Sequence, residues 1–250
     1  MKDNNGSLSD LIRRALASQI DLGLGEAIVG RTRSSAAEMS FGQPQVSKVV
    51  SVVDLFDKPA AQSAPQFPSL TAHREAVCNC QLCPLGQTRN KFVYGVGHDR
   101  AEVMFIGEAP GAEEDRLGEP FVGRAGQLLD KILAAIQLSR QQVYIANILK
   151  CRPPGNRDPI PDEMNKCFPY LKEQIRIIRP KIICALGRVA AQALLGTSTP
   201  LGKLRKRWHE YEGVPMIITY HPAALLRFPA YKKDTWEDVQ MLRARLDELK

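Results

Sequence analysis

Four apolar runs rich in β-branched residues constrain the fold of this chain more than any other feature. None contains a charged residue, and they lie at 103–107, 143–149, 182–187 and 216–220. A parallel strand covered on both faces has this near-continuous apolar character, whereas a half-exposed strand alternates apolar and polar residues. The four runs therefore predict four buried, parallel strands.

Helical patterns fill the sequence between these strands and after the last of them. They lie at 125–136, 162–178, 188–195 and 235–249. Pro161 precedes the second pattern and Pro180 follows it, as expected where a helix begins and ends. Strands that alternate with helices predict an α/β fold, a three-layer α/β/α sandwich with a central four-stranded parallel sheet.

The first 69 residues differ in composition and are expected to form an extension to a folded domain at 70–250. Residues 8–20 have helical spacing and predict a short amphipathic helix. The remainder is rich in Ser, Ala, Gln and Pro, which predicts a flexible, disordered linker. Its one apolar island, VVDLF from Val52 to Phe56, resembles peptides that dock on bacterial sliding clamps but lacks their leading Gln. A chance apolar stretch, or a transient helix in a tail, is the favoured interpretation.

The charge balance favours a polyanionic partner. Lys and Arg number 34 against 27 Asp and Glu, a net charge of +7, although a basic protein without such a partner is equally consistent with it. No uncharged apolar run reaches the ~18 residues of a membrane span. Charged residues at Asp10, Arg13 and Arg14 interrupt the N-terminal apolar stretch, unlike a signal peptide. We expect an intracellular protein that does not contact membranes.

Polar residues stand where three of the predicted strands end. Glu108 follows the first strand, Asn147 lies near the end of the second, and His221 follows the fourth. Ligands of parallel α/β sheets bind beyond the carboxyl ends of the strands. The turn at 107–115, GEAPGAEED, is acidic and is not followed by the Lys-Ser or Lys-Thr of a phosphate loop. A ligand other than phosphate is therefore expected.

Four cysteines have the character of metal ligands. Cys80 and Cys83 form a C-x2-C pair, whereas Cys151 and Cys167 stand 16 apart, and all four lie in loop-like sequence beside prolines. Four thiolates suit zinc or a [4Fe-4S] cluster, and the split second pair favours the cluster.

The other two cysteines have different settings. Cys78 could replace Cys80 as a ligand, although the C-x2-C spacing favours Cys80. Cys184 lies in an apolar strand and is expected to be inert core.

Four ordered motifs stand out: GEAPGAEED at 107–115, PFVGRAG at 120–126, YIANILKCRPPGNRDP at 144–159 and HPAALLR at 221–227. Together, and with the cysteines as spaced above, they resemble the family 4 uracil-DNA glycosylases, the iron-sulfur branch of their superfamily. The resemblance implies a base excision repair enzyme that hydrolyses the N-glycosidic bond of uracil in DNA and leaves an abasic site. It also implies a [4Fe-4S] cofactor, a prokaryotic cytoplasmic location and a substrate of single- or double-stranded DNA. We expect a monomer.

The resemblance and the chemistry of the side chains indicate the same catalytic residues. A carboxylate at Glu108 would orient a water and stabilise the positively charged sugar. A neutral imidazole at His221 would donate to uracil O2 as the base leaves as an anion. Glu114 is the candidate second acid, and an ion pair with Arg124 or a solvated position is the alternative.

An extruded base would be read in a pocket. Phe121 would stack on the pyrimidine, and Asn147 would accept from uracil N3–H and donate to O4, which the reversed edge of cytosine refuses. An ordinary core Phe and an Asn that ties down backbone are the alternatives. Gly107 and Ala109 complete the candidate uracil-binding set.

The segment after His221 is the candidate DNA-binding element. Leu225 or Leu226 would fill the space left by the flipped nucleotide, and Arg227 would contact a phosphate. The basic stretch at 203–208 is another candidate phosphate contact. The remaining histidines are expected at the surface: His73, His98 and His209.

Two departures from related branches bear on the mechanism. Ala109 and Gly111 stand where the best-known branch has Asp and Tyr, so an Asp-activated water is not expected here. The loop at 151–167 lacks the basic, His-containing insertion of a branch that becomes covalently linked to DNA, so turnover is expected. No lysine nucleophile is evident in the pocket motifs, which predicts a monofunctional enzyme. The alternatives are an inactive metal-stapled DNA-binding module, specificity for another deaminated base, and a nucleotide-binding α/β enzyme.

Overall fold

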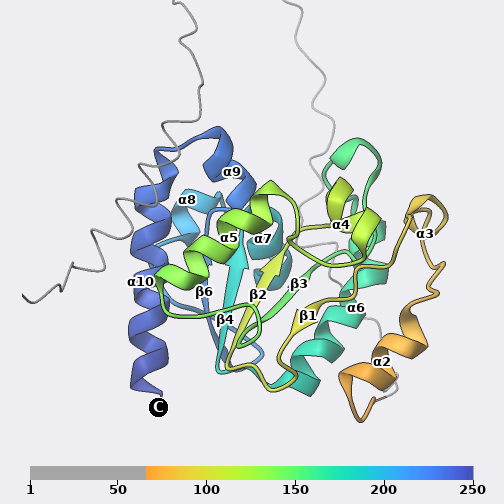
Figure 1. Cartoon of the computed structure of the whole chain (residues 1–250), viewed down its shortest axis with the longest axis horizontal. Coiled ribbons are helices and arrows are strands. Elements are labelled where there is room, and N and C mark those ends of the chain that lie inside the picture. Colours follow the sequence, from red (N-terminus) through yellow and green to blue (C-terminus); the bar gives the residue numbers. More distant parts are fainter. Residues whose placement is uncertain (1–65, 250) are drawn as a thin grey trace, which may run out of the picture. The chain divides into compact units, whose positions relative to one another are not determined.

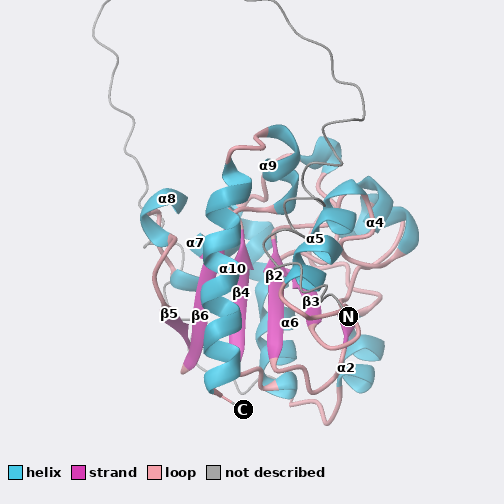
Figure 2. Cartoon of the chain, turned by 60° about the vertical axis from the view of Figure 1, so that its left-hand side comes forward, coloured by secondary structure: helices cyan, strands magenta, loops and turns pink. Residues whose placement is uncertain are grey.

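The computed structural model describes residues 66–249, which form a six-stranded mixed sheet with helices on both faces (Figures 1 and 2). The strands are β1 (Val96–Gly97), β2 (Val103–Gly107), β3 (Tyr144–Asn147), β4 (Ile182–Leu186), β5 (His209–Tyr211) and β6 (Val214–Thr219), in the order β1-β3-β2-β4-β6-β5. The four central strands are parallel, as predicted, and β1 and β5 pair antiparallel at the edges.

The described helices are α2 (Leu70–Val77), α3 (Leu85–Thr88), α4 (Ala112–Leu117), α5 (Arg124–Ala135), α6 (Pro161–Ile178), α7 (Arg188–Leu195), α8 (Leu201–Leu204), α9 (Pro222–Arg227) and α10 (Tyr231–Glu248), with a short 3-10 turn at Pro154–Asn156. The four predicted helices are present as α5, α6, α7 and α10, and the five other helices of the described residues were not predicted. None of the described helices is long and apolar enough to cross a membrane. The last helix begins four residues before the predicted position.

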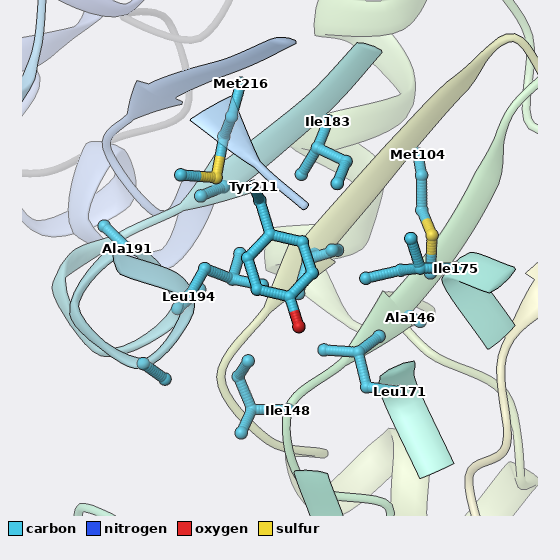
Figure 3. Close-up of a cluster of buried hydrophobic side chains, with 14 of the residues drawn as sticks. Met104, Ala146, Ile148, Leu171, Ile175, Ile183, Ala191, Leu194, Tyr211 and Met216 are labelled. Carbon is cyan, nitrogen blue, oxygen red and sulfur yellow. The ribbon is translucent and has the colours of Figure 1, made fainter. Parts of the chain in front are cut away.

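The three layers follow from side chains that alternate between the faces of the sheet. Met104 and Ile106 of β2 lie in a core with Leu171 and Ile175 of α6 and with α7, part of which Figure 3 shows. Phe105, between them, lies in the opposite core with residues of α5 and α10. Cys184 is fully buried in this second core, as predicted. The predicted sandwich is confirmed.

The edge strands escape sequence-based prediction because they are short. The β5–β6 hairpin turns at Glu212 and Gly213, whose φ angles are 48° and 84°. Two successive positive φ values are typical of the tight turns that match the twist of a hairpin. β1 has only two residues, too few for a periodic pattern.

Two sequence-based expectations were wrong. His73 is not at the surface: it is 1% exposed, its Nδ1 hydrogen-bonds the Tyr94 hydroxyl at 2.8 Å, and its ring packs on Phe67. Cys167 lies in helix α6, in agreement with the helix predicted at 162–178 but not with the loop-like setting expected of the ligand cysteines. The predicted N-terminal helix, the linker and the segment from Val52 to Phe56 lie outside the described residues.

All four parallel strands end at the same edge of the sheet. α4, α5 and α9 lie near this edge, in the upper part of Figure 1. The polar residues that follow the strands are therefore gathered there, as the rule for parallel sheets requires.

Candidate active site

A cavity of about 590 Å³ opens at the carboxyl edge of the sheet. Pockets for small ligands typically span roughly 300–1,000 Å³. The predicted residues that line it are Glu108, Ala109, Glu114, Phe121, Asn147, His221, Leu226 and Arg227. Segments more than a hundred residues apart in sequence thus contribute to one cavity.

Gly107 supports this cavity through its lack of a side chain. A Cβ atom at this position would overlap with Oδ1 of Asn147 and with Cζ of Phe121. The amide and the phenyl ring therefore both lie directly against the end of β2. Any larger residue at position 107 would displace one of them.

Phe121 is held in a left-handed backbone conformation, with φ at 55°. Arg140 stabilises it by donating to the carbonyl oxygens of Phe121 at 2.9 Å and Pro120 at 2.7 Å, and Asp130 pairs with Arg140 at 3.1 Å. Gly126 gives the Phe121 carbonyl room, because a Cβ there would overlap with it. The strained conformation is thus fixed by contacts outside the cavity.

His221 has the features of a neutral hydrogen-bond donor. Its Nδ1 accepts from the backbone N–H of Ala223 at 3.1 Å, which places the proton of a neutral ring on Nε2. Burial, and secondarily the charge of Arg227, lowers the pKa of His221 to about 4. Its ring lies 5.3 Å from that of Phe121, with 31° between the planes. Near neutral pH the imidazole ring is therefore uncharged, and its one proton is on Nε2.

Glu108 is a half-buried carboxylate in an acidic setting. Burial raises the pKa of Glu108, the carboxylate of Asp158 raises it further, and Arg188 opposes both. Asp158 and Arg188 form an ion pair at 2.5 Å. Glu108 is thus a stronger base than an exposed glutamate.

Glu114 lines the cavity and takes neither of the two alternative positions, an ion pair with Arg124 or a solvated face. Its Oε1 accepts the backbone N–H groups of Val122 and Gly123, both at 2.9 Å, at the start of α5. A carboxylate there is favoured by the positive end of the helix dipole. Arg124, the expected partner, is exposed and forms no ion pair within residues 66–249. Glu114 therefore ties α4 to the turn that follows Phe121.

Asn147 is 2% exposed, and its Oδ1 has no hydrogen-bond partner among the described residues. A buried oxygen without a partner costs free energy, so its retention in a cavity wall indicates a ligand that donates to it. Its backbone carbonyl accepts from Lys150 Nζ at 2.9 Å. The backbone is thus anchored while the side chain stays available.

The two candidate leucines of α9 have different positions. Leu225 is buried at 2% exposure, whereas Leu226 lines the cavity beside Arg227. Of the two, Leu226 is the one placed at the cavity mouth. In the basic stretch, Arg205 is buried against Asp238 at 2.7 Å, and Lys206 pairs with acidic residues of α10. Arg205 and Lys206 thus contact acidic side chains, whereas Lys203 and Arg207 form no ion pair within residues 66–249.

Sequence reasoning missed several residues that shape the cavity. Asn156, Arg157 and Asp158 line it from the loop that follows Cys151. The GNRDP stretch within the third motif was the available signal. No local signal identifies Arg140, because it reaches Phe121 only through the tertiary fold.

The four predicted ligand cysteines line a second, smaller cavity, between α3, α6 and the segment after β3. They are Cys80, Cys83, Cys151 and Cys167. Three receive hydrogen bonds at sulfur, each at 3.2 Å: Tyr170 Oη donates to Cys80, Arg89 Nη1 to Cys151 and the Lys150 N–H to Cys167. Cys78 points elsewhere, with its thiol donating to the Glu75 carbonyl at 3.5 Å.

Within the described residues, no three His, Cys, Asp or Glu side chains are arranged to hold one metal ion. The four cysteines line one small cavity but are not arranged around a single metal position.

Comparison with known proteins agrees with this geometry. Residues 94–240 match the family model of the uracil DNA glycosylase superfamily. The type-4 uracil-DNA glycosylase of Archaeoglobus fulgidus is 44% identical over 66% of this chain and 87% of its own length, and that of Sulfurisphaera tokodaii is 44% identical over 70% and 84%. A type-5 enzyme of Pyrobaculum aerophilum is 34% identical over 52% and 64%. The chain belongs to the uracil-DNA glycosylase superfamily, in its type-4 branch.

Proposed function

We propose that the cavity at the carboxyl edge of the sheet is where this chain carries out the uracil-DNA glycosylase reaction of its family. Uracil in DNA would be hydrolysed at its N-glycosidic bond, leaving an abasic site for base excision repair. The observation that carries the proposal is the gathering of Glu108, Asn147 and His221 in one cavity from three separate segments. An inactive DNA-binding module would not need all three.

Recognition of uracil rests on Asn147 and Phe121. The unpartnered Oδ1 of Asn147 accepts from uracil N3–H, and Nδ2 donates to O4. Phe121 provides a ring face for the extruded pyrimidine. Cytosine presents an acceptor at N3 and a donor at C4, so the same amide orientation opposes it.

Bond cleavage rests on His221 and Glu108. As the bond lengthens, charge develops on uracil O2, and the Nε2–H of neutral His221 donates to it. Glu108 lies on the cavity wall as a carboxylate of raised basicity, suited to orient a water and to stabilise the cationic sugar. Water attack at the sugar then yields the abasic site and free uracil.

The four cysteines of the second cavity fit a [4Fe-4S] cluster better than a single zinc ion. A cluster binds each thiolate to a different iron, so its ligands surround a space, whereas zinc needs four ligands at one point. Donors to three of the sulfurs offset thiolate charge. When bound, the cluster would link the loop before α3, helix α6 and the segment after β3.

Two finer proposals concern partners. The chain would act on DNA as a monomer, and the segment from Val52 to Phe56 would dock on a sliding clamp. A pull-down with the clamp tests the second proposal, and unchanged capture after deletion of that segment would end it.

A base-release assay tests the main proposal. The full chain is incubated with oligonucleotides that contain one uracil, cytosine or thymine, and abasic sites are cut with alkali. We expect cleavage only at uracil and no cleavage before alkali. His221→Ala should lower kcat by about 10²–10³-fold, as loss of one oxyanion donor does. Absence of cleavage by folded wild-type protein would contradict the proposal.

A further inference from the structure

A stack of aromatic side chains lies beside the candidate active site and has no role in the reaction described above. Its members come from one continuous segment that also carries His221: Tyr220, Phe228 and Tyr231. Tyr220 immediately precedes His221, and Phe228 immediately follows Arg227, which lines the cavity. Along the chain, the stack therefore flanks the residues of α9 that line the cavity.

Tyr220 and Tyr231 form the stacked pair at the base of the stack. The rings of Tyr220 and Tyr231 are parallel within 3°, with centroids 4.2 Å apart. The guanidinium of Arg205 lies 4.2 Å from the centroid of Tyr220, and Asp238 fixes that guanidinium at 2.7 Å. A cation against a ring face contributes about 0.5–2 kcal/mol. The inner rings are thus held in place without any ligand.

The outer part of the stack is exposed. Phe228 is 55% exposed and Tyr231 37% exposed, and their ring centroids lie 5.7 Å apart with the planes tilted by 50°. The other large exposed apolar residues of the described chain are the single aliphatic side chains Leu82, Leu117 and Ile160. Phe228 and Tyr231 therefore form the aromatic surface that stands out from this background.

The charges around the stack match a nucleic acid strand. The side chains of Arg227, Lys232 and Lys233 form no ion pair within residues 66–249. Cations beside exposed rings are the combination by which proteins hold single-stranded DNA, with the backbone on the charges and the bases on the rings.

We propose that Phe228, supported by Tyr231 and Tyr220, is a stacking subsite for a nucleobase that neighbours the extruded uracil in the same strand. The inference rests on the proposed function, because it requires uracil in the adjacent cavity. Stacking on an aromatic side chain is sequence-tolerant, so the subsite would strengthen binding without selecting a neighbouring base.

Steady-state kinetics on single-stranded oligonucleotides test the subsite. The substrates carry one uracil with normal neighbours, or with an abasic spacer on its 5′ or its 3′ side. Phe228→Ala should raise KM about tenfold on the normal substrate, within the range reported for loss of one base–aromatic stack. One of the two spacers removes the base that stacks on Phe228. On that substrate, wild type and Phe228→Ala should have the same KM. Phe228→Trp should retain the wild-type KM, and Leu117→Ala controls for the loss of exposed apolar surface.

A binding measurement separates the subsite from the reaction. 2-Aminopurine is placed beside the uracil, and its fluorescence should fall on binding to wild type and to Phe228→Trp but not to Phe228→Ala. Wild-type protein that quenches the probe but releases no uracil would overturn the proposed function alone. Equal KM for wild type and Phe228→Ala on the normal substrate, or an equal rise on all three substrates, would overturn the subsite alone. The same rise in Leu117→Ala would also overturn it.

Discussion

The Nζ atom of Lys150 donates a hydrogen bond to the backbone carbonyl of Asn147 at 2.9 Å, and a second to Oε1 of Gln174 at 2.6 Å. Lys150 is fully buried, and its backbone N–H donates to the sulfur of Cys167 at 3.2 Å. One residue therefore contacts both the segment that holds Asn147 and a predicted cluster ligand. The recognition side chain and the cysteine cavity share a support.

Replacing Lys150 should reduce activity although its side chain does not line the cavity. Lys150→Met keeps the length of the side chain but removes both donors, so the carbonyl of Asn147 loses its anchor. Small misplacements of a recognition group cost up to about 10²-fold in rate. We expect kcat/KM to fall at least tenfold, with the visible absorbance of the cluster unchanged. Wild-type kcat/KM in this variant would show that Asn147 needs no such anchor.

Glu114 should act through structure more than through chemistry. Glu114→Ala removes the acceptor for two backbone N–H groups, and an unsatisfied buried donor costs about 1–3 kcal/mol. We expect the free energy of unfolding and kcat/KM both to fall, because the same turn carries Phe121. Glu114→Gln keeps one oxygen acceptor and should lose less of each. Urea unfolding and uracil release are measured together. Loss of activity in Glu114→Gln at wild-type stability would instead assign Glu114 a direct role as an acid.

The pH dependence of kcat/KM should reflect the protonation of Glu108 and not that of His221. Because burial lowers the pKa of His221 to about 4, its imidazole stays neutral at higher pH and gives no inflection near 6.5. The pKa of Glu108 is raised above its ordinary 4.5, so kcat/KM should fall as the pH drops through that raised value and the carboxylate is protonated. Asp158→Asn should move this limb to lower pH. A limb that does not move would contradict the coupling between the two carboxylates.

The two candidate ligands Cys78 and Cys80 provide a matched pair. Cys80 lines the cavity and accepts from Tyr170, whereas Cys78 points to the carbonyl of Glu75. Cys80→Ser should lower the iron content, the brown absorbance and the folded yield, and Cys78→Ser should leave all three near wild type. The reverse result would exchange the two ligands.

The parallel sheet and the main polar residues of the site could be predicted because their signals are local. An apolar run indicates a buried strand, and the rule that ligands bind beyond strand ends brings Glu108, Asn147 and His221 to one edge. The hydrogen bonds from Arg140 to Phe121 and from the turn at 122–123 to Glu114 had no such signal. They join residues that are brought together only by the tertiary fold. Neither the periodicity nor the composition of the sequence indicates that these residues are close in space. The burial of His73 escaped prediction for the same reason.

The most direct test of the proposed site is to compare activity and stability in Asn147→Ala. The side chain of Asn147 forms no hydrogen bond within the described residues, and its Oδ1 is buried without a partner. Its removal should therefore change the free energy of unfolding by less than about 1 kcal/mol. Loss of its contacts to uracil should lower kcat/KM by about 10²-fold or more, since leaving a hydrogen-bonding group of the substrate unpaired is costly. A variant that is destabilised but still releases uracil with wild-type kcat/KM and selectivity would contradict the account.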